Sequence, residues 1–530
     1  MRRRSHWAWG WADRFPDRDA RRAIGEQVRA ITSFDVKDVH EPIALDAITM
    51  PTPRIDAPPT LAEIASIDHE DRALHTRGRS YRDVVRGFHG DFASAPDLVM
   101  RPRDEREVEA VLDWASDARV AVIPFGGGTS VVGGVELEER RDAYAGVVSL
   151  DLGAMTRVLE VDATSRAARI QAGATGPQLE SQLAQHGVSM RCYPQSYEHS
   201  TLGGWIATRA GGHFATVYTH VDDLVESMRV VTPRGLIETR RLPASGAGPS
   251  PDRLMLGSEG IFGVITDAWV RVQVRPTFRA SASVKFTSYE RAVDATRAIA
   301  QSGLFPSNCR LLDQREAMMN GVAMGASVLV LGFESADHPL EAWMERALSI
   351  ARAQGGESEG ASYRSGAGSA DDAAGRWRQA FLDAPYLQSS LVSLGMIADT
   401  FETACTWDRF ATLHAAVVRA VRDASARVCG AKALVSCRFT HVYPDGPAPY
   451  YTFVAPATRG RELEQWTEIK RAASDALMAH GATITHHHAV GRLHRPWYEQ
   501  ERPSLFEHVL RATKRELDPA GILNPGVLLA

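Results

Sequence analysis

One glycine-rich stretch, residues 121–135, constrains the chain more than any other part of its sequence. It begins with the apolar run Ala121-Val-Ile-Pro-Phe125, typical of a buried strand, and then turns on Gly126, Gly127 and Gly128. Consecutive glycines let backbone N–H groups converge and let a ligand approach the main chain closely. The stretch has neither the Gly-Lys-Ser/Thr of a P-loop nor the Gly-x-Gly-x-x-Gly of the dinucleotide fold. It therefore indicates either a backbone loop that binds a pyrophosphate or a plain flexible turn.

The bulk properties of the chain limit its class. At 530 residues it has room for two or three domains with sizeable cores. Its net charge of -5 argues against nucleic-acid binding. Its five cysteines are scattered and form no Cys-x-x-Cys pair, which fits a reducing compartment. No run approaches the roughly 20 apolar residues that span a bilayer, and early acidic residues argue against a signal peptide. We therefore expect a cytoplasmic protein.

Three tryptophans, Trp7, Trp9 and Trp11, follow three arginines near the start of the chain. Tryptophans beside arginines suit a membrane surface, but aromatic side chains more often contribute to cores. We expect these rings to pack against the body of the protein, with peripheral membrane contact as the alternative.

Hydrophobic periodicity separates an N-terminal segment, 1–90, from a first domain, 91–276. The segment is polar, helix-prone and interrupted by prolines, and 18–31 should form one amphipathic helix. The domain mixes short strands and short helices around the glycine loop. Its expected strands cover 98–100, 120–123, 147–150 and 167–172, and its expected helices lie around 108–115 and over 178–186.

Residues 277–480 repeat strand, helix and strand, which predicts an α+β layer with one sheet covered by helices on one face. Stretches 244–251 and 354–374 are rich in Gly, Ser, Pro or Ala and should be loops. Residues 481–530 should form a turn-rich closure. The expected strands of this domain cover 282–286, 309–312, 327–333, 436–442 and 450–454, and its helices cover 289–302, 340–353, 462–479 and a segment from 407.

Two further glycine-rich segments lie in the first domain. Residues 193–207 combine hydroxyl groups with Gly203 and Gly204, and 256–266 add glycines and the carboxylate of Glu259. Either segment alone could be a structural turn. Three such segments in one domain, with no catalytic nucleophile among them, favour a large cofactor that lies along the backbone.

A histidine run, Thr485-His-His-His-Ala-Val-Gly491, is the clearest candidate for chemistry. Side chains of a regular strand alternate between faces, so three adjacent histidines cannot all reach one metal. No acidic residue or cysteine stands nearby at ligand spacing, and we expect no metal. A structural or solvated run stays open, but we favour an active-site wall with one or two imidazoles as hydrogen-bond donors or proton carriers. Tyr450 and Tyr451, on a nearby expected strand, offer either an acid/base phenol or a core ring.

Taken in order, these segments resemble the flavoenzyme superfamily typified by vanillyl-alcohol oxidase. The resemblance implies a two-subdomain FAD-binding domain over 91–276, an α+β substrate (cap) domain over 277–480, and a C-terminal segment, 481–530, that carries the histidine loop back to the FAD domain. Residues 1–90 become a helical extension. Some members attach FAD to a histidine after the loop glycines; Thr129 stands there, which implies non-covalent FAD. The implied FAD contacts are Pro124, Gly126, Gly127, Gly128, Thr129, Ser130, Gly134, Pro194, Ser196, Thr201, Gly203, Gly204, Ala207, Glu259, Gly263 and Ile265.

Within that superfamily the chain most resembles the alkylglycerone-phosphate synthase family. The resembling pieces are Trp9-Gly-Trp11, 200–209, 231–235, Phe401-Glu-Thr403 with Trp407-Asp-Arg409, and 486–491. That family exchanges the acyl group of acyl-dihydroxyacetone phosphate for a fatty alcohol through an adduct at FAD N5, without net redox change, in ether lipid synthesis. The resemblance makes Tyr450 the acid/base, places His486, His487 and His488 in the active-site loop, and matches Arg310 to another family arginine. We expect a homodimer that acts on a small-molecule or lipid substrate.

The chain departs from that family at a position that bears on the substrate. Gln388 follows Pro385-Tyr-Leu387 where the synthases carry an arginine important for activity, Gln195 replaces an aspartate, and Ile261-Phe262 replaces Thr-Leu. Arginine binds a phosphate by charge-assisted bonds that glutamine cannot form. The alternative is therefore an FAD-linked oxidase or dehydrogenase of a hydroxyl-bearing substrate such as a 2-hydroxy acid. A flavoprotein scaffold without catalysis is a third hypothesis.

Overall fold

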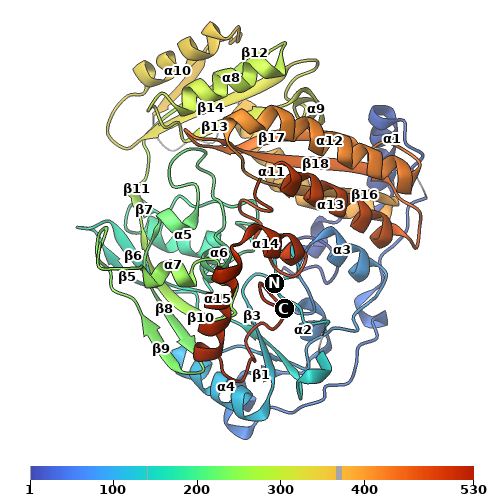
Figure 1. Cartoon of the computed structure of the whole chain (residues 1–530), viewed down its shortest axis with the longest axis vertical. Helices are drawn as coiled ribbons and strands as arrows, with labels where there is room; N and C mark the ends of the chain where they lie inside the picture. The colour runs from blue at the N-terminus through green and yellow to red at the C-terminus, as the bar shows by residue number, and fades with distance from the viewer. Residues whose placement is uncertain (1, 37, 140, 366–372) are drawn as a thin grey trace.

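The computed structural model describes residues 2–36, 38–139, 141–365 and 373–530. Its strands form sheets that fall on the two sides of residue 277: those of the first unit use residues 65–274, and the seven-stranded sheet of the second uses 278–456. Figure 1 shows the second unit above the first, with the C-terminal helices returning to the lower one. The fold is thus α+β with an FAD-domain-like pair of sheets and a larger second sheet. The four-segment division of the chain stays a prediction.

The first small sheet carries the glycine loop. Its strand order is β1-β2-β4-β3, in which β2, β4 and β3 run parallel and β1 runs antiparallel. The predicted strands and helix are confirmed here, since α4 begins after the N-cap Asp104 and buries Val108, Val111 and Leu112. The elements are β1 Ala65–Ser66, β2 Leu98–Met100, α4 Glu105–Ala118, β3 Ala121–Phe125 and β4 Val147–Asp151.

The second small sheet packs the other two glycine-rich segments against the first. It is antiparallel, with the order β5-β6-β10-β8-β9, and a separate strand pair joins β11 to β7. Helix α5 confirms the helix predicted over 178–186, shifted by two residues, and Thr175 and Gln178 form a capping box at its start. The elements are β5 Val158–Asp162, β6 Ala167–Gln171, α5 Gly176–Ala184, β7 Val188–Ser189, α6 Leu202–Thr208, β8 Val225–Thr232, β9 Gly235–Glu238, α7 Pro251–Met255, β10 Val264–Arg271 and β11 Gln273–Val274.

The second unit is one sheet in the order β15-β12-β14-β13-β17-β18-β16. Every strand and helix predicted over 277–480 is present within a few residues of its expected bounds. The elements are β12 Phe278–Phe286, α8 Tyr289–Ala300, β13 Asn308–Leu312, α9 Gln314–Met319, β14 Ser327–Ser335, α10 Glu341–Ala353, β15 Ala361–Ser365, α11 Ala373–Ser393, β16 Met396–Glu402, α12 Trp407–Cys429, β17 Leu434–Val442, β18 Pro447–Pro456 and α13 Glu462–Ala479.

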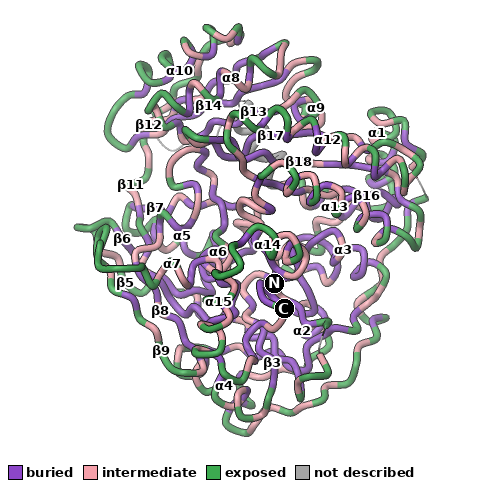
Figure 2. Tube along the Cα trace, viewed as in Figure 1, coloured by how far each residue is buried: buried purple, intermediate pink, exposed green. Residues whose placement is uncertain are grey.

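The two faces of this sheet differ: one packs mainly against helices, and the other lines a cavity. Cys437, Tyr451 and Phe453 point to the face that packs against α8, α10, α12 and α13. Because strand side chains alternate, Arg438 and Tyr450 point to the opposite face, which lines a cavity. The prediction of helices on one face was incomplete, since α9 and α11 pack on the cavity side. Figure 2 shows the strands buried and the outer turns of α8 and α10 exposed.

The two ends of the chain pack onto the sheets rather than forming a separate unit. Helix α1 (Arg18–Thr32) confirms the predicted amphipathic helix, and its bounds agree to one residue. Trp7 and Trp9 are buried, which confirms the packing prediction for these two rings. The C-terminal tail pairs Leu523 with Val122 on β3. The remaining helices are α2 His69–Leu74, α3 Tyr81–Phe88, α14 Arg495–Glu501 and α15 Ser504–Leu517.

Two loop predictions meet different outcomes. Residues 244–250 form a loop as expected, but 354–374 was wrongly predicted as one loop, because β15 lies inside it and pairs with β12. Its part 366–372 lies outside the described residues. Among the helices that the structure describes, none is both long enough and apolar enough to cross a membrane.

Candidate active site

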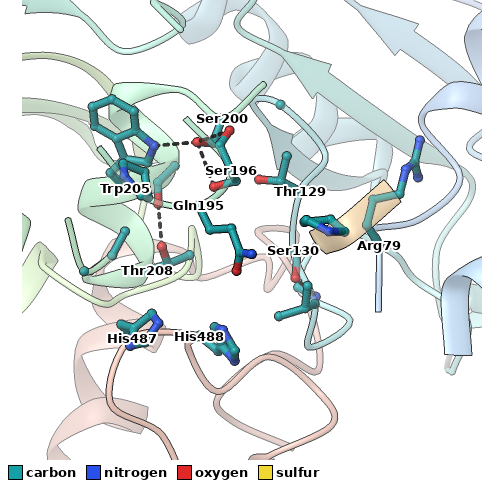
Figure 3. Close-up of a pocket in the computed structure, with 18 of the residues that line it drawn as sticks. Arg79, Thr129, Ser130, Gln195, Ser196, Ser200, Trp205, Thr208, His487 and His488 are labelled. Atoms are coloured by element: carbon teal, nitrogen blue, oxygen red, sulfur yellow. Dashed lines mark hydrogen bonds between the residues drawn. The ribbon is translucent and has the colours of Figure 1, made fainter. Parts of the chain in front are cut away.

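A cavity of about 390 Å³ lies between the glycine-rich segments of the first unit and the inner face of the seven-stranded sheet. Every residue predicted as a cofactor contact lines it, from Pro124 to Ile265. Of the residues predicted for chemistry, Tyr450, Arg310, His487 and His488 line it too. Figure 3 shows Thr129 and Ser130 on one wall, Ser196, Ser200 and Trp205 on another, and His487 and His488 across from them. The structure therefore gathers predictions that were made from distant segments.

The glycine loop occupies a place that no larger residue fits. A Cβ atom at Gly126 would overlap the Thr201 hydroxyl, one at Gly127 would overlap the His199 carbonyl, and Gly128 has φ +64°. The backbone amides of residues 126–130 have no acceptor among the residues that the structure describes. Unpaired amides are costly to bury, so a row of them beside a cavity suits an anionic group.

The second glycine-rich segment, 193–207, packs against the glycine loop. Thr201 caps α6 by accepting a hydrogen bond from Gly204 N, and Gly203 N donates to Ala172 O at 2.8 Å. Ser200 accepts a 2.7 Å hydrogen bond from the Trp205 indole and is itself 2.9 Å from the Ser196 hydroxyl. These bonds, drawn in part in Figure 3, fix the hydroxyl groups at the cavity wall.

The third segment joins the loop to the end of the chain. Glu259 accepts hydrogen bonds from Val490 N at 2.9 Å and Gly491 N at 2.8 Å. Burial raises the pKa of this carboxyl to about 7. Asn524 donates to the carbonyl oxygens of Gly134 and Glu259, at 2.9 and 2.7 Å. The tail of the chain thereby closes the cofactor side of the cavity.

A buried phenol stands on the sheet face of the cavity. Tyr450 donates a 2.9 Å hydrogen bond to the Thr400 hydroxyl, and the Arg438 guanidinium lies 3.9 Å from the centre of its ring. Arg438 also forms a 2.6 Å ion pair with Glu316 on α9. Burial raises the pKa of Tyr450, while Arg438 and the Thr400 bond oppose that rise. A phenol held between a cation and a hydroxyl suits proton transfer.

The histidine run is a loop, so its side chains do not alternate between two faces as those of a regular strand would. One carboxylate holds it: Glu402 accepts hydrogen bonds from the Thr485 hydroxyl and from the backbone amides of His486, His487 and His488, at 2.6 to 3.2 Å. His487 and His488 face the cavity, but His486 does not line it. His487 and His488 thus agree with a wall of one or two imidazoles, and an active-site role for His486 stays a prediction.

His486 instead sits in a cluster of rings behind the wall. Its Nε2 lies 2.7 Å from the Tyr443 hydroxyl and 3.1 Å from His220 Nε2, while its Nδ1 lies 3.0 Å from His487 Nδ1. His441 from β17 completes the cluster, and one ligand atom each from His441, His486 and His487 lies within 4.8 Å of the others. Imidazoles from β17 and from the histidine loop thus come close enough to share a metal, although the three adjacent histidines are not such a set.

Acid should destabilise the protein through this cluster. Burial holds the pKa values of His441, His486 and His487 well below the usual 6.5. The folded state therefore stays neutral while the unfolded chain takes up protons below pH 6.5, so stability is lost as the pH falls. The thermal midpoint should therefore fall between pH 7 and 5, where the unfolded imidazoles become protonated.

The variant His441→Gln tests the source of that fall. Glutamine keeps a donor toward the Gly212 carbonyl, which His441 now contacts at 3.1 Å, but it cannot titrate. Its thermal midpoint should fall less between pH 7 and 5 than that of the parent protein. An identical fall in both proteins would show that other groups carry the acid sensitivity.

Some residues of the site were not among those predicted to act in catalysis or to bind the cofactor. They are Arg79, Trp9, Thr400, Glu316, Glu402, Arg438 and His441. Glu402 lies in the motif Phe401-Glu-Thr403 and Trp9 lies in the motif Trp9-Gly-Trp11, both of which resemble the family. Their place in these motifs could have marked them as site residues. Thr400, Arg438 and His441 depend on strand pairing that the sequence does not reveal, and Arg79 and Glu316 reach the site from a loop and from α9.

Comparisons with known proteins agree with this geometry. The family model described as FAD binding domain matches residues 96–240, and that of the C-terminal domain of FAD linked oxidases matches 275–528. Because a loop with unpaired amides lines a cavity that also has hydroxyl groups and an apolar wall, the residues present fit FAD, which is the cofactor of this chain.

Relatives and solved structures narrow the family. The chain is 32% identical to the alkyldihydroxyacetonephosphate synthase of Dictyostelium discoideum over 86% of this chain and 77% of the relative. It is 31% identical to that of Trypanosoma brucei brucei over 87% and 78%. A solved alkyldihydroxyacetonephosphate synthase superposes with a TM-score of 0.79 at 27% identity, covering 93% of this chain and 90% of the other. This chain therefore belongs to the alkyldihydroxyacetonephosphate (alkylglycerone-phosphate) synthase family of FAD-dependent enzymes.

Proposed function

We propose that this enzyme exchanges the acyl group of acyl-dihydroxyacetone phosphate for a fatty alcohol and so forms the ether bond of ether lipids. The observation that carries the proposal is the buried Tyr450, which meets the cavity between Arg438 and Thr400. Tyr450 would hold and return the proton that moves at the substrate during exchange. When bound, FAD supplies a nucleophilic nitrogen of its ring system, and the exchange needs no net oxidation.

Two arginines support binding of a phosphorylated substrate despite Gln388. Arg310 and Arg438 both line the cavity and both are buried. Burial lowers the pKa of Arg310 to about 9, which leaves it charged at neutral pH. We assign Arg310 to the phosphate group, because a guanidinium donates bidentate bonds to phosphate oxygens.

The cavity also has an apolar part that suits an alkyl chain. It lies between α9, α11, the edge strand β16 and its neighbour β18. Its side chains are Met319, Leu387, Leu391, Ala398 and Val454. Burying a long chain there would contribute about 0.8 kcal/mol for each methylene group. His487 and His488 close the opposite side as hydrogen-bond donors or acceptors.

A second candidate function rests on Gln388 itself. Its amide donates to Ala398 O at 2.8 Å and lies 3.5 Å from the Asp399 carboxylate, which pairs with Lys470 at 3.4 Å. A carboxylate at this wall suits a hydroxyl group better than a phosphate. The candidate is an FAD-linked oxidase or dehydrogenase of a hydroxyl-bearing substrate such as a 2-hydroxy acid.

The finer properties of the enzyme are also proposals. Thr129 after the loop glycines supports non-covalent FAD, which acid denaturation should release. We propose a homodimer in the cytoplasm that contacts a membrane surface when it takes up its lipid substrates. Mass measurement in solution and flotation with phospholipid vesicles test these two points.

One assay separates the two functions. FAD-saturated protein receives palmitoyl-dihydroxyacetone phosphate and labelled hexadecanol, and the ether product and released palmitate are counted while the flavin absorbance is followed. Equal yields of ether and palmitate, without lasting flavin bleaching, support the synthase. No labelled product, together with anaerobic bleaching by 2-hydroxy acids, would replace it with the dehydrogenase.

A further inference from the structure

Residues 2–15 form a small hairpin, here called the N-terminal hairpin, that lies against the glycine loop. Arg4 pairs with Trp11 in an antiparallel bridge. Ser5 N donates to Gly10 O and Ala12 N donates to Arg3 O, both at 2.9 Å. The segment therefore has a defined shape of its own.

The hairpin touches both units of the protein. Trp9 lines the cavity, and its backbone amide donates to the Ser389 hydroxyl on α11 at 3.3 Å. The Trp11 indole donates to Glu198 at 2.6 Å, and Arg14 pairs with Asp383 on α11. The hairpin thus bridges the cofactor loop of the first unit and the cavity side of the second.

Two hydrogen bonds orient the glycine loop from the side of the hairpin. Arg4 Nη2 donates to Gly127 O at 2.9 Å, and Arg79 N donates to Ser130 O at 2.6 Å. In a trans peptide the carbonyl and the next N–H point in opposite directions. Drawing these carbonyls toward the arginines therefore turns the amides of Gly128 and Val131 away from them.

Arg79 also holds the hairpin in place. Its Nη2 donates to Ser5 O at 2.9 Å and its Nη1 donates to Gly78 O at 2.7 Å. Figure 3 shows Arg79 beside Ser130, with its side chain directed away from His487 and His488. Arg79 thus links the backbone of the hairpin to the backbone of the loop.

The corner between hairpin and loop is strongly positive. Among the described residues, no carboxylate lies within ion-pair distance of Arg4 or Arg79. Burial lowers the pKa of Arg79 to about 9, so it remains charged at neutral pH. Burial and the nearby arginines, Arg4 and Arg79 first, lower the pKa of His199 to about 3. Glu198 and Asp151 act on Arg4, and Asp83 acts on Arg79, but none of them is in ion-pair contact. A buried cation that lacks a directly paired carboxylate is costly, which favours an anion at this place.

We propose that the N-terminal hairpin is part of the cofactor site, with Arg4 and Arg79 as positioning residues for the pyrophosphate of FAD. Arg4 orients the Gly128 amide through the Gly127 carbonyl and supplies positive charge behind the loop. Arg79 fixes the hairpin on the loop. The proposal concerns cofactor binding and does not depend on which reaction the enzyme catalyses.

Binding of FAD and of riboflavin, which lacks both phosphates, to the full-length apoprotein tests the proposal. Arg4→Met should raise the Kd for FAD at least about tenfold, since it removes a charge-assisted contact, and leave the Kd for riboflavin unchanged. Arg3→Met is the matched control, because Arg3 lies on the same hairpin in an exposed pair with Glu70; it should bind both ligands as the parent does.

Arg4→Lys keeps the charge and should retain most of the FAD affinity, so it serves if Arg4→Met does not fold. Parent-like FAD binding by Arg4→Met would overturn the proposal. So would an equal loss of FAD and riboflavin, or an equally weakened Arg4→Lys, since each would point to general disruption rather than to charge beside a pyrophosphate.

Discussion

Tyr450→Phe is expected to lower the rate of alkyl exchange by about 10³-fold, the usual contribution of a positioned acid/base group. Phenylalanine keeps the ring that packs under Arg438 at 3.9 Å and removes only the hydroxyl, whose hydrogen bond goes to Thr400. The fold, the bound FAD and the cation–π contact should therefore survive. The loss should appear in kcat, because proton transfer belongs to the chemical step.

Tyr451→Phe is the matched control for that variant. Tyr451 is the next residue on β18, but it points to the opposite face, where it stacks on Phe401 and lies 3.4 Å from His414. Its loss should leave the rate within about twofold, as for other conservative changes away from a site. Equal rates for Tyr450→Phe and the parent would remove Tyr450 from the proton transfer, and FAD absorbance of both variants checks that the cofactor is retained.

Much of the second unit could be predicted because its periodicity is regular. Helix α13 has the predicted bounds, 462–479, since Trp466, Ile469 and Ala473 repeat at helical spacing. By contrast, β8 and β10 had no prediction. Their pairing contains register shifts that break the alternation of apolar and polar residues. Two of their charged residues form ion pairs with residues far away in the sequence. Arg229 pairs with Glu105, and Asp267 pairs with Arg169.

The strand partner of Tyr450 shows why the sheet side of the site could not be predicted from the sequence. The turn after Val442 pairs that residue with Pro447, and simple counting back along the hairpin would place Phe439 opposite Tyr450. A bulge between Phe439 and His441 shifts the register, so that Arg438 stands opposite Tyr450 instead. One extra residue thus exchanges an apolar partner for a cation. Sequence patterns fix neither the bulge nor the ion pair of Arg438 with Glu316.

The cofactor side of the site was easier to predict, because its glycines indicate places where another part of the backbone or a ligand comes close. Gly126 and Gly127 are required by backbone and hydroxyl groups of residues 199–201, which lie in the second glycine-rich segment. Each segment therefore carries a local signal for a contact made elsewhere. The histidine loop has no such signal for Glu402, since a single glutamate more than eighty residues away holds it.

Glu402→Gln should cost both stability and activity. The carboxylate accepts four hydrogen bonds from residues 485–488 and donates none. An amide would turn one oxygen into a donor that faces an N–H group, leaving buried donors unpaired at a cost of about 2–4 kcal/mol. The neighbouring imidazoles and these hydrogen bonds lower the pKa of Glu402 against the effect of burial. The carboxylate thus contributes stability above its unfolded pKa, which is lost as the pH falls below it.

Glu180→Gln provides the comparison that separates loop positioning from general destabilisation. Glu180 is also a buried carboxylate, and it accepts from the Ser189 hydroxyl and the amides of Met190 and Arg191. Both variants should unfold at lower denaturant concentration than the parent, but only Glu402→Gln should lose alkyl exchange per folded molecule, because His487 and His488 would leave the cavity wall. Equal activity in the two variants would mean that the wall keeps its shape without the Glu402 carboxylate, and the imidazoles would then need another anchor.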